Sequence, residues 1–342
     1  MADKTDKPKI LQVGVGSFGQ NHLRTLVEIL GHDNIFLAEL DQHKDYAISL
    51  MTKFGIPSDN FTTDYRAFLS RKDISGVDIV TSTDSHYPIA RDALEANKDV
   101  FIEKPMTSSS EQTAELIDIA EERGGLIIQP GHIFRYNPAV QWIKQHVDAG
   151  NLGKLRIFDG HFGGYKRPRT DVGVAWTDGV HFIDLAMYFF NSRPVKVQAQ
   201  MKEFLKRDGD LEDWANVHFE FEGGEIAQVQ TEYFYPGKYR DIIVVGERAT
   251  VKADVVSQNI KLYKQRHLFQ GGLWKASEAS LVEPDITTRE PLDLELRAFC
   301  KSVISREPPI ATAEAAYNLA RVIEAMYIAN KERREVNIEY LR

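Results

Sequence analysis

The sequence is poor in cysteine, in long apolar runs and in any excess of basic residues. Its single cysteine, Cys300, cannot form an intramolecular disulfide, which excludes small disulfide-stapled secreted scaffolds. The residues before Lys9 lack the apolar core of a signal peptide, and no run approaches the ~20 apolar residues that span a bilayer. A formal net charge of −8 argues against a non-specific nucleic-acid binder. We therefore expect a cytoplasmic protein with no membrane or nucleic-acid partner.

Size and composition indicate an ordinary globular protein of two domains. The chain has 342 residues, of which 43% are hydrophobic and 27% charged, close to the globular average. At roughly 100–200 residues per domain, two domains are expected. Because the patterning changes near His132, we place them at residues 1–130 and 131–342. No cluster of cysteine and histidine suggests a zinc site, so we expect no metal.

The first region alternates short apolar runs with amphipathic stretches. Strands are expected at Ile10–Val15, Ile35–Leu40, Val77–Thr81, Val100–Glu103 and Leu126–Gln129, with helices between them. Strands that alternate with helices form a parallel sheet covered by helices on both faces. The region is therefore predicted to be a doubly wound α/β domain.

The second region is dominated by strands after one helix at Asn137–Ala149. Apolar and polar residues alternate in Val195–Lys202 and Ala227–Tyr233, and Gly246–Arg248 reads as a hairpin turn between two more strands. Alternation with period two is typical of an antiparallel sheet with one wet or partner-covered face. With closing helices at Asp293–Ser305 and Thr312–Lys331, the region is predicted to be an α+β domain with a mostly antiparallel sheet.

The first strand leads into a glycine-rich turn, Gly14-Val15-Gly16-Ser17-Phe18-Gly19. The first glycine permits a tight turn, the second lets a pyrophosphate approach the backbone, and the third lets helix and strand pack closely. Unpaired amides at the start of the next helix favour the negative charge. The turn predicts a dinucleotide site, and a related domain that binds another nucleotide or none is the alternative.

An acidic residue near the end of the second strand bears on the choice of dinucleotide. Asp41 lies 22 residues after Gly19, close to the expected ~20. A carboxylate there accepts hydrogen bonds from a ribose diol and repels a 2′-phosphate, which favours NAD over NADP. Glu39 lies near the same strand end, so the assignment to Asp41 stays open.

The tripeptide Glu103-Lys104-Pro105 follows another predicted strand. The carboxyl ends of parallel strands face the ligand crevice in such sheets, and lysine is rarely buried without a partner. Beside a cationic nicotinamide, the amine suits acid–base or hydrogen-bonding work on a hydroxyl. The tripeptide alone leaves a catalytic lysine and a surface lysine before a turn equally open.

The order of these motifs resembles the Gfo/Idh/MocA oxidoreductases. Gly131–Val140 is similar to the segment that opens the family's second domain, and Asp171–Val174 with Gly179–Asp184 resembles its substrate-site helix. The closing region from Glu295 also fits, so the resemblance covers essentially the whole chain. It implies an N-terminal Rossmann domain and a C-terminal domain with a large open sheet. That sheet would form a homodimer or homotetramer, with the last helices packing toward the Rossmann domain.

The resemblance also implies roles for individual residues. Lys104 and His181 would be the catalytic residues, and His181 has a buried, backbone-satisfied histidine as its alternative. Further cofactor contacts would come from Ser17, Phe18, Thr81, Thr83, His86, Glu103 and Lys104, beside the three glycines and Asp41. Substrate contacts would come from Arg135, Asn137, Lys166, Arg167, Thr177, Asp178 and His181.

One position departs from the family pattern. Many members carry an aspartate four residues before the histidine, where this sequence has Thr177, and Asp178 follows one residue later. A shift of one residue on a regular helix turns a side chain by about 100°. Asp178 therefore reaches the site only if the segment is not a regular helix. Otherwise His181 works without it, with Asp184 as a neighbour.

The expected substrate is a sugar or nucleotide sugar whose ring carbon exchanges hydride with the nicotinamide. The segments at 135–140 and 171–174 most resemble a nucleotide-sugar subgroup that includes UDP-N-acetylglucosamine 3-dehydrogenases. The basic loop Lys166–Arg169 either holds a diphosphate or is a solvated surface loop. Three alternatives remain: a cyclitol or free-sugar dehydrogenase, a non-catalytic NAD-binding regulator, and an enzyme that uses the cofactor transiently to cleave a glycosidic bond.

Overall fold

The computed structural model describes residues 7–170, 172–206, 209 and 211–341. The chain forms two compact units, one of Met1–Ile133 with Glu290–Tyr317 and the other of Phe134–Arg289 with Asn318–Arg342. A stretch from the C-terminal part of the sequence therefore belongs to the first unit. The assignment of one unit to the cofactor and the other to substrate and oligomer contacts stays a prediction.

The first unit contains a six-stranded parallel sheet in the order β3-β2-β1-β4-β5-β6. Its strands are β1 (Lys9–Val13), β2 (Ile35–Ala38), β3 (Phe61–Thr62), β4 (Ile74–Ile79), β5 (Asp99–Ile102) and β6 (Ile128–Pro130). This is the doubly wound order predicted from the sequence, and it reverses between β1 and β4. Ligands of such sheets bind outside the carboxyl ends of the strands at that point.

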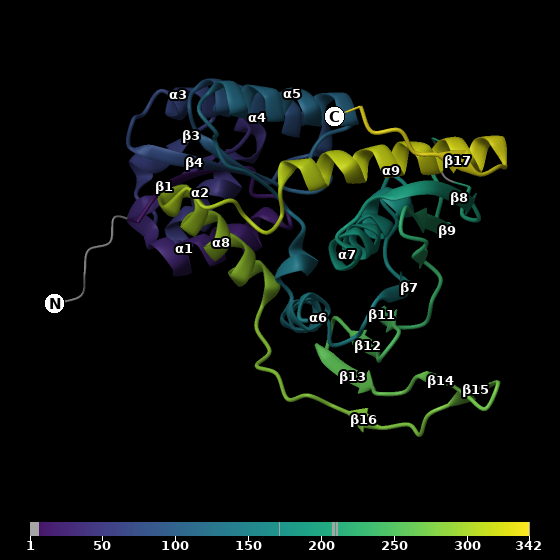
Figure 1. The fold of residues 1–342 in the computed structure, drawn as a ribbon. Coiled ribbons are helices and arrows are strands. Elements are labelled where there is room, and N and C mark those ends of the chain that lie inside the picture. Colours follow the sequence, from purple (N-terminus) through teal and green to yellow (C-terminus); the bar gives the residue numbers. More distant parts are fainter. Residues whose placement is uncertain (1–6, 171, 207–208, 210, 342) are drawn as a thin grey trace. The chain divides into compact units, whose positions relative to one another are not determined.

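Helices cover both faces of this sheet (Figure 1). They are α1 (Gly19–Leu30), α2 (Lys44–Phe54), α3 (Tyr65–Leu69), α4 (Thr83–Glu95), α5 (Ser110–Glu122) and α8 (Pro291–Ser305). Neighbouring residues of β1 point to opposite faces, so Ile10 packs in the cluster of α1, α2 and α8, and Leu11 in that of α3, α4 and α5. The late helix α8 packs against α1 and completes the first unit.

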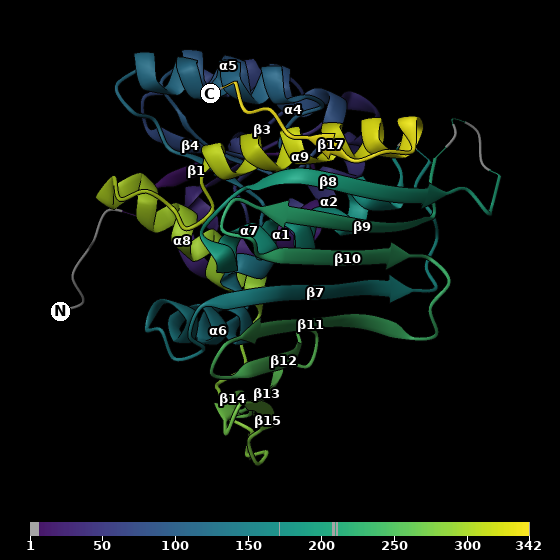
Figure 2. The same cartoon turned by 45° about the vertical axis from the view of Figure 1, so that its right-hand side comes forward.

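The second unit contains a nine-stranded sheet in the order β16-β13-β12-β11-β7-β10-β9-β8-β17 (Figure 2). Its strands are β7 (Leu155–Gly164), β8 (Pro194–Lys202), β9 (Trp214–Phe221), β10 (Ile226–Glu232), β11 (Lys238–Gly246), β12 (Thr250–Asp254), β13 (Asn259–Tyr263), β16 (Leu281–Val282) and β17 (Val336–Asn337). Among the described strands of this sheet, only β7 and β10 pair in parallel. The prediction of a large, mostly antiparallel sheet is confirmed.

Three helical segments accompany this sheet. They are α6 (Pro138–Asp148), a π-helix (Ala175–Gly179) that runs directly into α7 (Val180–Phe190), and the later part of α9 (Ala313–Glu332). Helix α7 packs on β7 and β10, and its apolar side chains join those of the sheet in one core. The boundary between the two units falls within α9.

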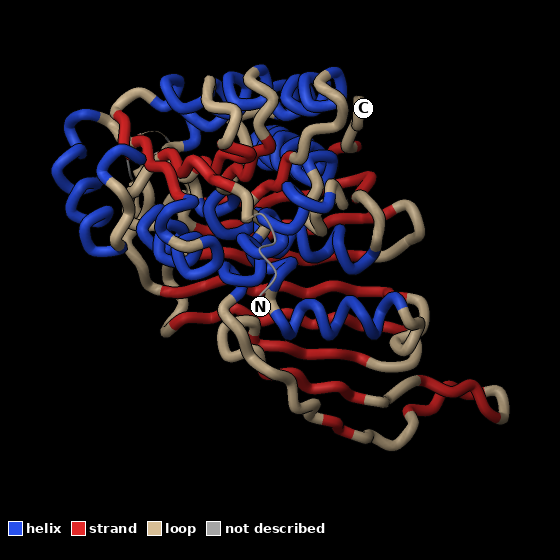
Figure 3. Tube along the Cα trace, turned by 90° about the vertical axis from the view of Figure 1, so that its left-hand side faces the viewer, coloured by secondary structure: helices blue, strands red, loops and turns tan. Residues whose placement is uncertain are grey.

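A hairpin of two short strands projects beyond the end of the nine-stranded sheet that is formed by β13 and the edge strand β16 (Figure 3). We call residues 264–282 the arm, which holds β14 (His267–Gln270) and β15 (Leu273–Ala276) and ends in β16. Phe269 and Trp274 face each other across the hairpin and are 61% and 70% exposed. The arm therefore contributes little to the core of the second unit.

The described residues contain no candidate membrane span and no candidate metal site. No helix within them combines the length and apolarity needed to cross a membrane. No group of three or more histidine, cysteine, aspartate or glutamate side chains in the same residues is placed to hold a metal ion.

Candidate functional site

The three glycines of the turn have different surroundings in the structure. Gly14 has a φ of +95°, and a Cβ there would lie 2.6 Å from the carbonyl oxygen of Val80. A Cβ on Gly19 would lie 2.5 Å from the oxygen of Gly14. At Gly16 no atom lies within 4 Å of the Cβ position. Gly14 and Gly19 are therefore required for packing, whereas Gly16 keeps one side of the turn open to an approaching ligand.

The start of α1 suits a negatively charged group. No side chain caps this helix at Phe18, and its first turn contains no acidic residue. The amides at a helix start carry a partial positive charge, which such caps normally satisfy. An open glycine beside an uncapped helix start fits the pyrophosphate of a dinucleotide.

Glu39, rather than Asp41, contacts the glycine-rich turn. Its carboxylate accepts hydrogen bonds from the amides of Val15 and Leu40, both at 2.8 Å. Asp41 is exposed at the start of the 3-10 helix Asp41–His43. Glu39 directly follows β2 and contacts the turn, and which of the two acids would contact a cofactor stays a prediction.

His86 joins the loops that follow β4 and β5. Its Nδ1 lies 2.9 Å from the oxygen of Pro105 and its Nε2 lies 3.1 Å from the oxygen of Thr81. The side chain is buried and joins these loops, and its expected contact with a cofactor stays a prediction. Thr81 and Thr83 are half-exposed at the carboxyl end of β4.

Three buried ionisable side chains, Asp78, His22 and Glu103, lie in a row near the glycine-rich turn. The backbone amide of Lys104 follows at the Glu103 end of this row. His22 in α1 places Nδ1 3.1 Å from Asp78 and Nε2 3.3 Å from Oε1 of Glu103. The other oxygen of Glu103 accepts a hydrogen bond from the backbone amide of Lys104 at 3.0 Å. Glu103 therefore fixes the main chain at the half-exposed Lys104, and its expected cofactor contact stays a prediction.

The charge of His22 follows from this arrangement. Burial opposes the imidazolium, but the carboxylates of Asp78 and Glu103 outweigh it and raise the pKa of His22 to about 10. Burial also raises the pKa of Asp78, against the pull of His22. At neutral pH the row contains a cation held between two acidic groups. Nothing in the sequence analysis singled out His22 or Asp78, because a histidine within an amphipathic helix carries no special signal.

In the second unit, His181 lies in an aromatic cluster. Its ring packs edge-on to Phe134 at 5.0 Å and parallel to Phe162 at 5.8 Å between centroids. The ammonium of Lys166 lies 5.6 Å from the Phe162 centroid and 2.6 Å from Oδ1 of Asp178. The structure thus brings His181, Lys166 and Asp178, three of the expected site residues, around one phenylalanine.

The π-helix explains how Asp178 takes part. Residues Ala175–Gly179 have wider turns than an α-helix, so the segment is not the regular helix that would rotate Asp178 away. Oδ2 of Asp178 is buried and has no hydrogen-bond partner among the described residues. A buried carboxylate oxygen in this state is ready to accept a hydroxyl donor.

Three of the expected substrate contacts also have structural contacts. Arg135 is buried and donates to Asp184 through two nitrogens, the shortest contact being 2.7 Å. Asn137 is buried and caps α6 through the amides of Ala139 and Val140, and Thr177 donates to the oxygen of Gly173. Their substrate roles stay predictions. Arg167 is exposed, and Asp171 of the resembling motif lies outside the described residues.

Arg240 was not anticipated. Its guanidinium carbon lies 3.3 Å from the Phe162 centroid, and the group donates to the backbone oxygens of Gly163 and Tyr239. Burial lowers the pKa of Arg240, while the charge of Asp178 opposes that shift. An arginine in the middle of β11 gives no sequence signal, because only the fold brings it to Phe162.

The sheet order, the glycine-rich turn and the lysine after β5 define a Rossmann-fold oxidoreductase that binds a nicotinamide cofactor. Residues 9–132 match the family model described as "Oxidoreductase family, NAD-binding Rossmann fold", and residues 140–252 match the "GFO/IDH/MocA C-terminal domain". The chain belongs to the Gfo/Idh/MocA oxidoreductase family.

Similar proteins act on sugars and cyclitols. The chain is 26% identical over 321 residues to scyllo-inositol 2-dehydrogenase (NAD(+)) of Bacillus subtilis, covering 90% of both chains. It is 24% identical over 297 residues to UDP-N-acetylglucosamine 3-dehydrogenase of Acidithiobacillus ferrooxidans, covering 86% of this chain and 88% of the other. A solved structure of the latter enzyme has a TM-score of 0.82 at 22% identity, covering 94% and 97%. That likeness shows the shared fold.

Proposed function

We propose that this chain is an NAD-dependent dehydrogenase that oxidises a secondary hydroxyl on the ring of a sugar or cyclitol. The observation that carries the proposal is Lys104, held by Glu103 at the carboxyl end of β5 in a unit whose glycine-rich turn is open at Gly16. A bound nicotinamide would supply the hydride acceptor. Lys104 and His181 would hold or remove the hydroxyl proton as hydride leaves the ring carbon.

Glu39 supports NAD over NADP. Its carboxylate accepts two backbone amides and has further lone pairs that can accept hydrogen bonds from a ribose diol. A 2′-phosphate would meet that negative charge. We expect NADH to bind at least tenfold more tightly than NADPH in a fluorescence titration. Glu39→Gln should decrease the ratio of the NADPH dissociation constant to the NADH dissociation constant. Asp59→Asn is the matched control, because Asp59 is exposed and precedes β3 at the amino end of the sheet, and Asp41→Asn tests whether Asp41 shares the role.

Asp178 supports a substrate rich in hydroxyl groups. Its buried Oδ2 lacks a donor, and a ring hydroxyl would supply one. The ammonium of Lys166 is already paired with Oδ1 of the same residue, which leaves one cation fewer for a diphosphate. This contact favours a cyclitol or free sugar as a second candidate beside the nucleotide sugar that the sequence suggests.

A substrate screen tests the proposal. Reduction of NAD would be followed with scyllo-inositol, myo-inositol, glucose, UDP-glucose and UDP-N-acetylglucosamine, with binding of each measured in parallel. Net NADH formation is expected with one class, whereas transient use of the cofactor forms none and a regulator binds without turnover. Lys104→Ala should abolish turnover and Lys72→Ala, an exposed lysine of the first unit, should not. Near-normal turnover by Lys104→Ala would refute the role of Lys104.

Arg167→Ala separates the two substrate candidates. If the loop holds a diphosphate, this variant raises KM for a nucleotide sugar much more than KM for a free sugar or cyclitol. Equal effects on both would remove the nucleotide-sugar candidate's diphosphate contact.

A further inference from the structure

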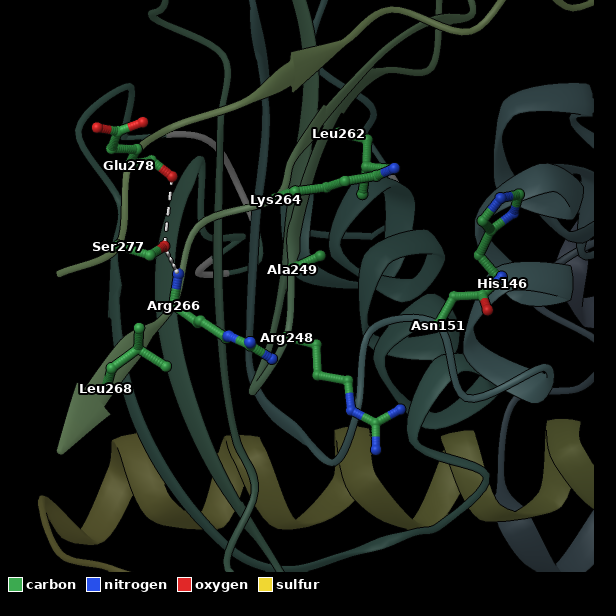
Figure 4. Close-up of a pocket in the computed structure, with 10 residues that line it drawn as sticks. All are labelled: His146, Asn151, Arg248, Ala249, Leu262, Lys264, Arg266, Leu268, Ser277 and Glu278. Carbon is green, nitrogen blue, oxygen red and sulfur yellow. Dashed lines mark hydrogen bonds between the residues drawn. The ribbon is translucent and has the colours of Figure 1, made fainter. Parts of the chain in front are cut away.

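A basic cavity of about 860 Å³ lies in the second unit, beside the start of the arm (Figure 4). Its cations come from separate segments: Arg248 follows β11 in the turn before β12, Lys264 and Arg266 follow β13, and His146 ends α6. Neither the glycine-rich turn nor the aromatic cluster around His181 contributes to its lining. The cavity is therefore separate from the residues assigned to catalysis.

The charges in this cavity are not neutralised by the protein. Among the described residues, Arg248, Lys264 and Arg266 form no ion pair. Neighbouring charges do pair, since Glu247 binds Arg156, Lys252 binds Asp241 and Lys261 binds Glu283. In a chain with a net charge of −8, these three exposed and unpaired cations make a local positive patch around one cavity, which attracts an external anion.

The rest of the lining suits a ligand with both a charged and an apolar part. Asn151 and Ser277 offer polar groups, whereas Ala249, Leu262 and Leu268 offer apolar surface. Glu278 is the single carboxylate of the lining, and Figure 4 shows it turned away from both arginines. A volume of this size exceeds what an inorganic ion needs and is in the range of small-molecule sites.

Main-chain hydrogen bonds hold the backbone that carries Lys264 and Arg266. The amide of Lys264 donates to the oxygen of Ser280 at 2.8 Å, and the amide of Ser277 donates to the oxygen of Arg266 at 2.8 Å. The hydroxyl of Ser277 accepts from the amide of Arg266 at 3.0 Å. His146 stacks on Trp142 with centroids 3.6 Å apart. The backbone of this part of the lining and the ring of His146 are thus held before a ligand arrives, which lowers the entropic cost of binding.

We propose that this cavity binds a phosphorylated small molecule. The planar guanidinium groups of Arg248 and Arg266 match phosphate oxygens, and Lys264 adds a point charge. The apolar surface contacts the organic part of the ligand. The proposal does not depend on the substrate of the dehydrogenase.

Fructose 1,6-bisphosphate is the probe, titrated calorimetrically into the full chain with saturating NADH at low salt. Dissociation in the millimolar range or tighter is expected, and it should weaken as salt rises. Arg248→Ala/Arg266→Ala should weaken binding at least tenfold. Lys252→Ala/Lys261→Ala removes two paired cations from neighbouring strands and should change affinity less than twofold. Inorganic phosphate, which lacks an organic part, should bind more weakly than the bisphosphate.

A second measurement locates the ligand. Acetylation of Lys264, followed by mass spectrometry, should be slower in the presence of the bisphosphate, whereas acetylation of Lys261 should not change. The proposal fails if no binding is detected at millimolar probe, if the arginine double variant binds normally, or if both double variants lose affinity equally. The last result would mean attraction to overall charge rather than to this cavity.

Discussion

Replacing His22 by glutamine is expected to destabilise the first unit by about 3–5 kcal/mol at neutral pH. The side chain is fully buried between Asp78 and Glu103, with contacts of 3.1 and 3.3 Å. A neutral amide of similar size keeps the packing but leaves two buried acidic groups without their cation. Removing one member of a buried ion pair costs this much because the remaining charge stays out of water.

The pH dependence follows from the raised pKa of His22, about 10 against 6.5 in the unfolded chain. Between those values the folded state holds a proton that the unfolded state releases. The contribution of His22 is therefore fully present below pH 6.5 and is lost as the pH rises toward 10. Over that window the advantage of the natural sequence over His22→Gln should shrink by at most about 1.4 kcal/mol per pH unit.

Cys300 provides the assay, because it is the only cysteine of the chain and is buried in the first unit. Burial raises the pKa of its thiol to about 12, so a thiol reagent labels it when the unit opens. Labelling along a urea series gives the free energy of opening, while tryptophan fluorescence follows the second unit, which holds Trp142, Trp176, Trp214 and Trp274. Separate probes are needed because two units can unfold independently.

His32→Gln is the control for this experiment. His32 is exposed and its contact with Asp33 is 3.5 Å long, so its loss should change stability by less than about 0.5 kcal/mol. A His22→Gln variant within about 1 kcal/mol of the natural protein, or one whose deficit is constant from pH 6.5 to 9.5, would contradict the charged state of His22.

Two further predictions concern the turn and the second unit. Gly19→Ala should lower Tm and abolish NADH binding, because its Cβ would meet the oxygen of Gly14 at 2.5 Å. Gly16→Ala should leave Tm unchanged and weaken NADH binding, as thermal melts and fluorescence titrations would show. Arg135→Met should cost about 3–5 kcal/mol by stranding Asp184 in the core. The double variant Arg135→Met/Asp184→Leu should recover part of that loss in urea unfolding followed by tryptophan fluorescence.

The sheet of the first unit was predictable because each strand carries its own signal. Buried parallel strands are short apolar runs, and the helices between them allow few connections. The second sheet was less accessible. β7 mixes charged and glycine residues in Leu155–Gly164 and was not identified as a strand. Its parallel pairing with β10 depends on distant segments, which local periodicity does not encode.

Some of the candidate site residues were likewise predictable from the sequence, and others were not. Gly14, Gly16 and Gly19 could be predicted from the sequence, because the spacing of the three glycines itself indicates the backbone turn that they form. The choice between Glu39 and Asp41 could not be predicted, because it depends on where β2 ends and which carboxylate meets the turn. Both acids lie at a suitable sequence distance from Gly19. The structure distinguishes them because Glu39 accepts a hydrogen bond from the amide of Val15.

The segment before His181 was the least predictable part of the site from sequence, because residues distant in the chain contact it and hold its conformation. The amide of Ala175 donates to Glu212 at 3.0 Å, and Tyr327 of α9 donates to the same carboxylate at 2.8 Å. Gly173 makes room, since a Cβ there would fall within 2.1 Å of both Glu212 oxygens. These contacts accompany the π-helix that brings Asp178 to Lys166. Asp178 lies one residue after the family's usual aspartate position. It remains a site candidate because of the π-helix, whose contacts with Glu212 and Tyr327 belong to no sequence motif.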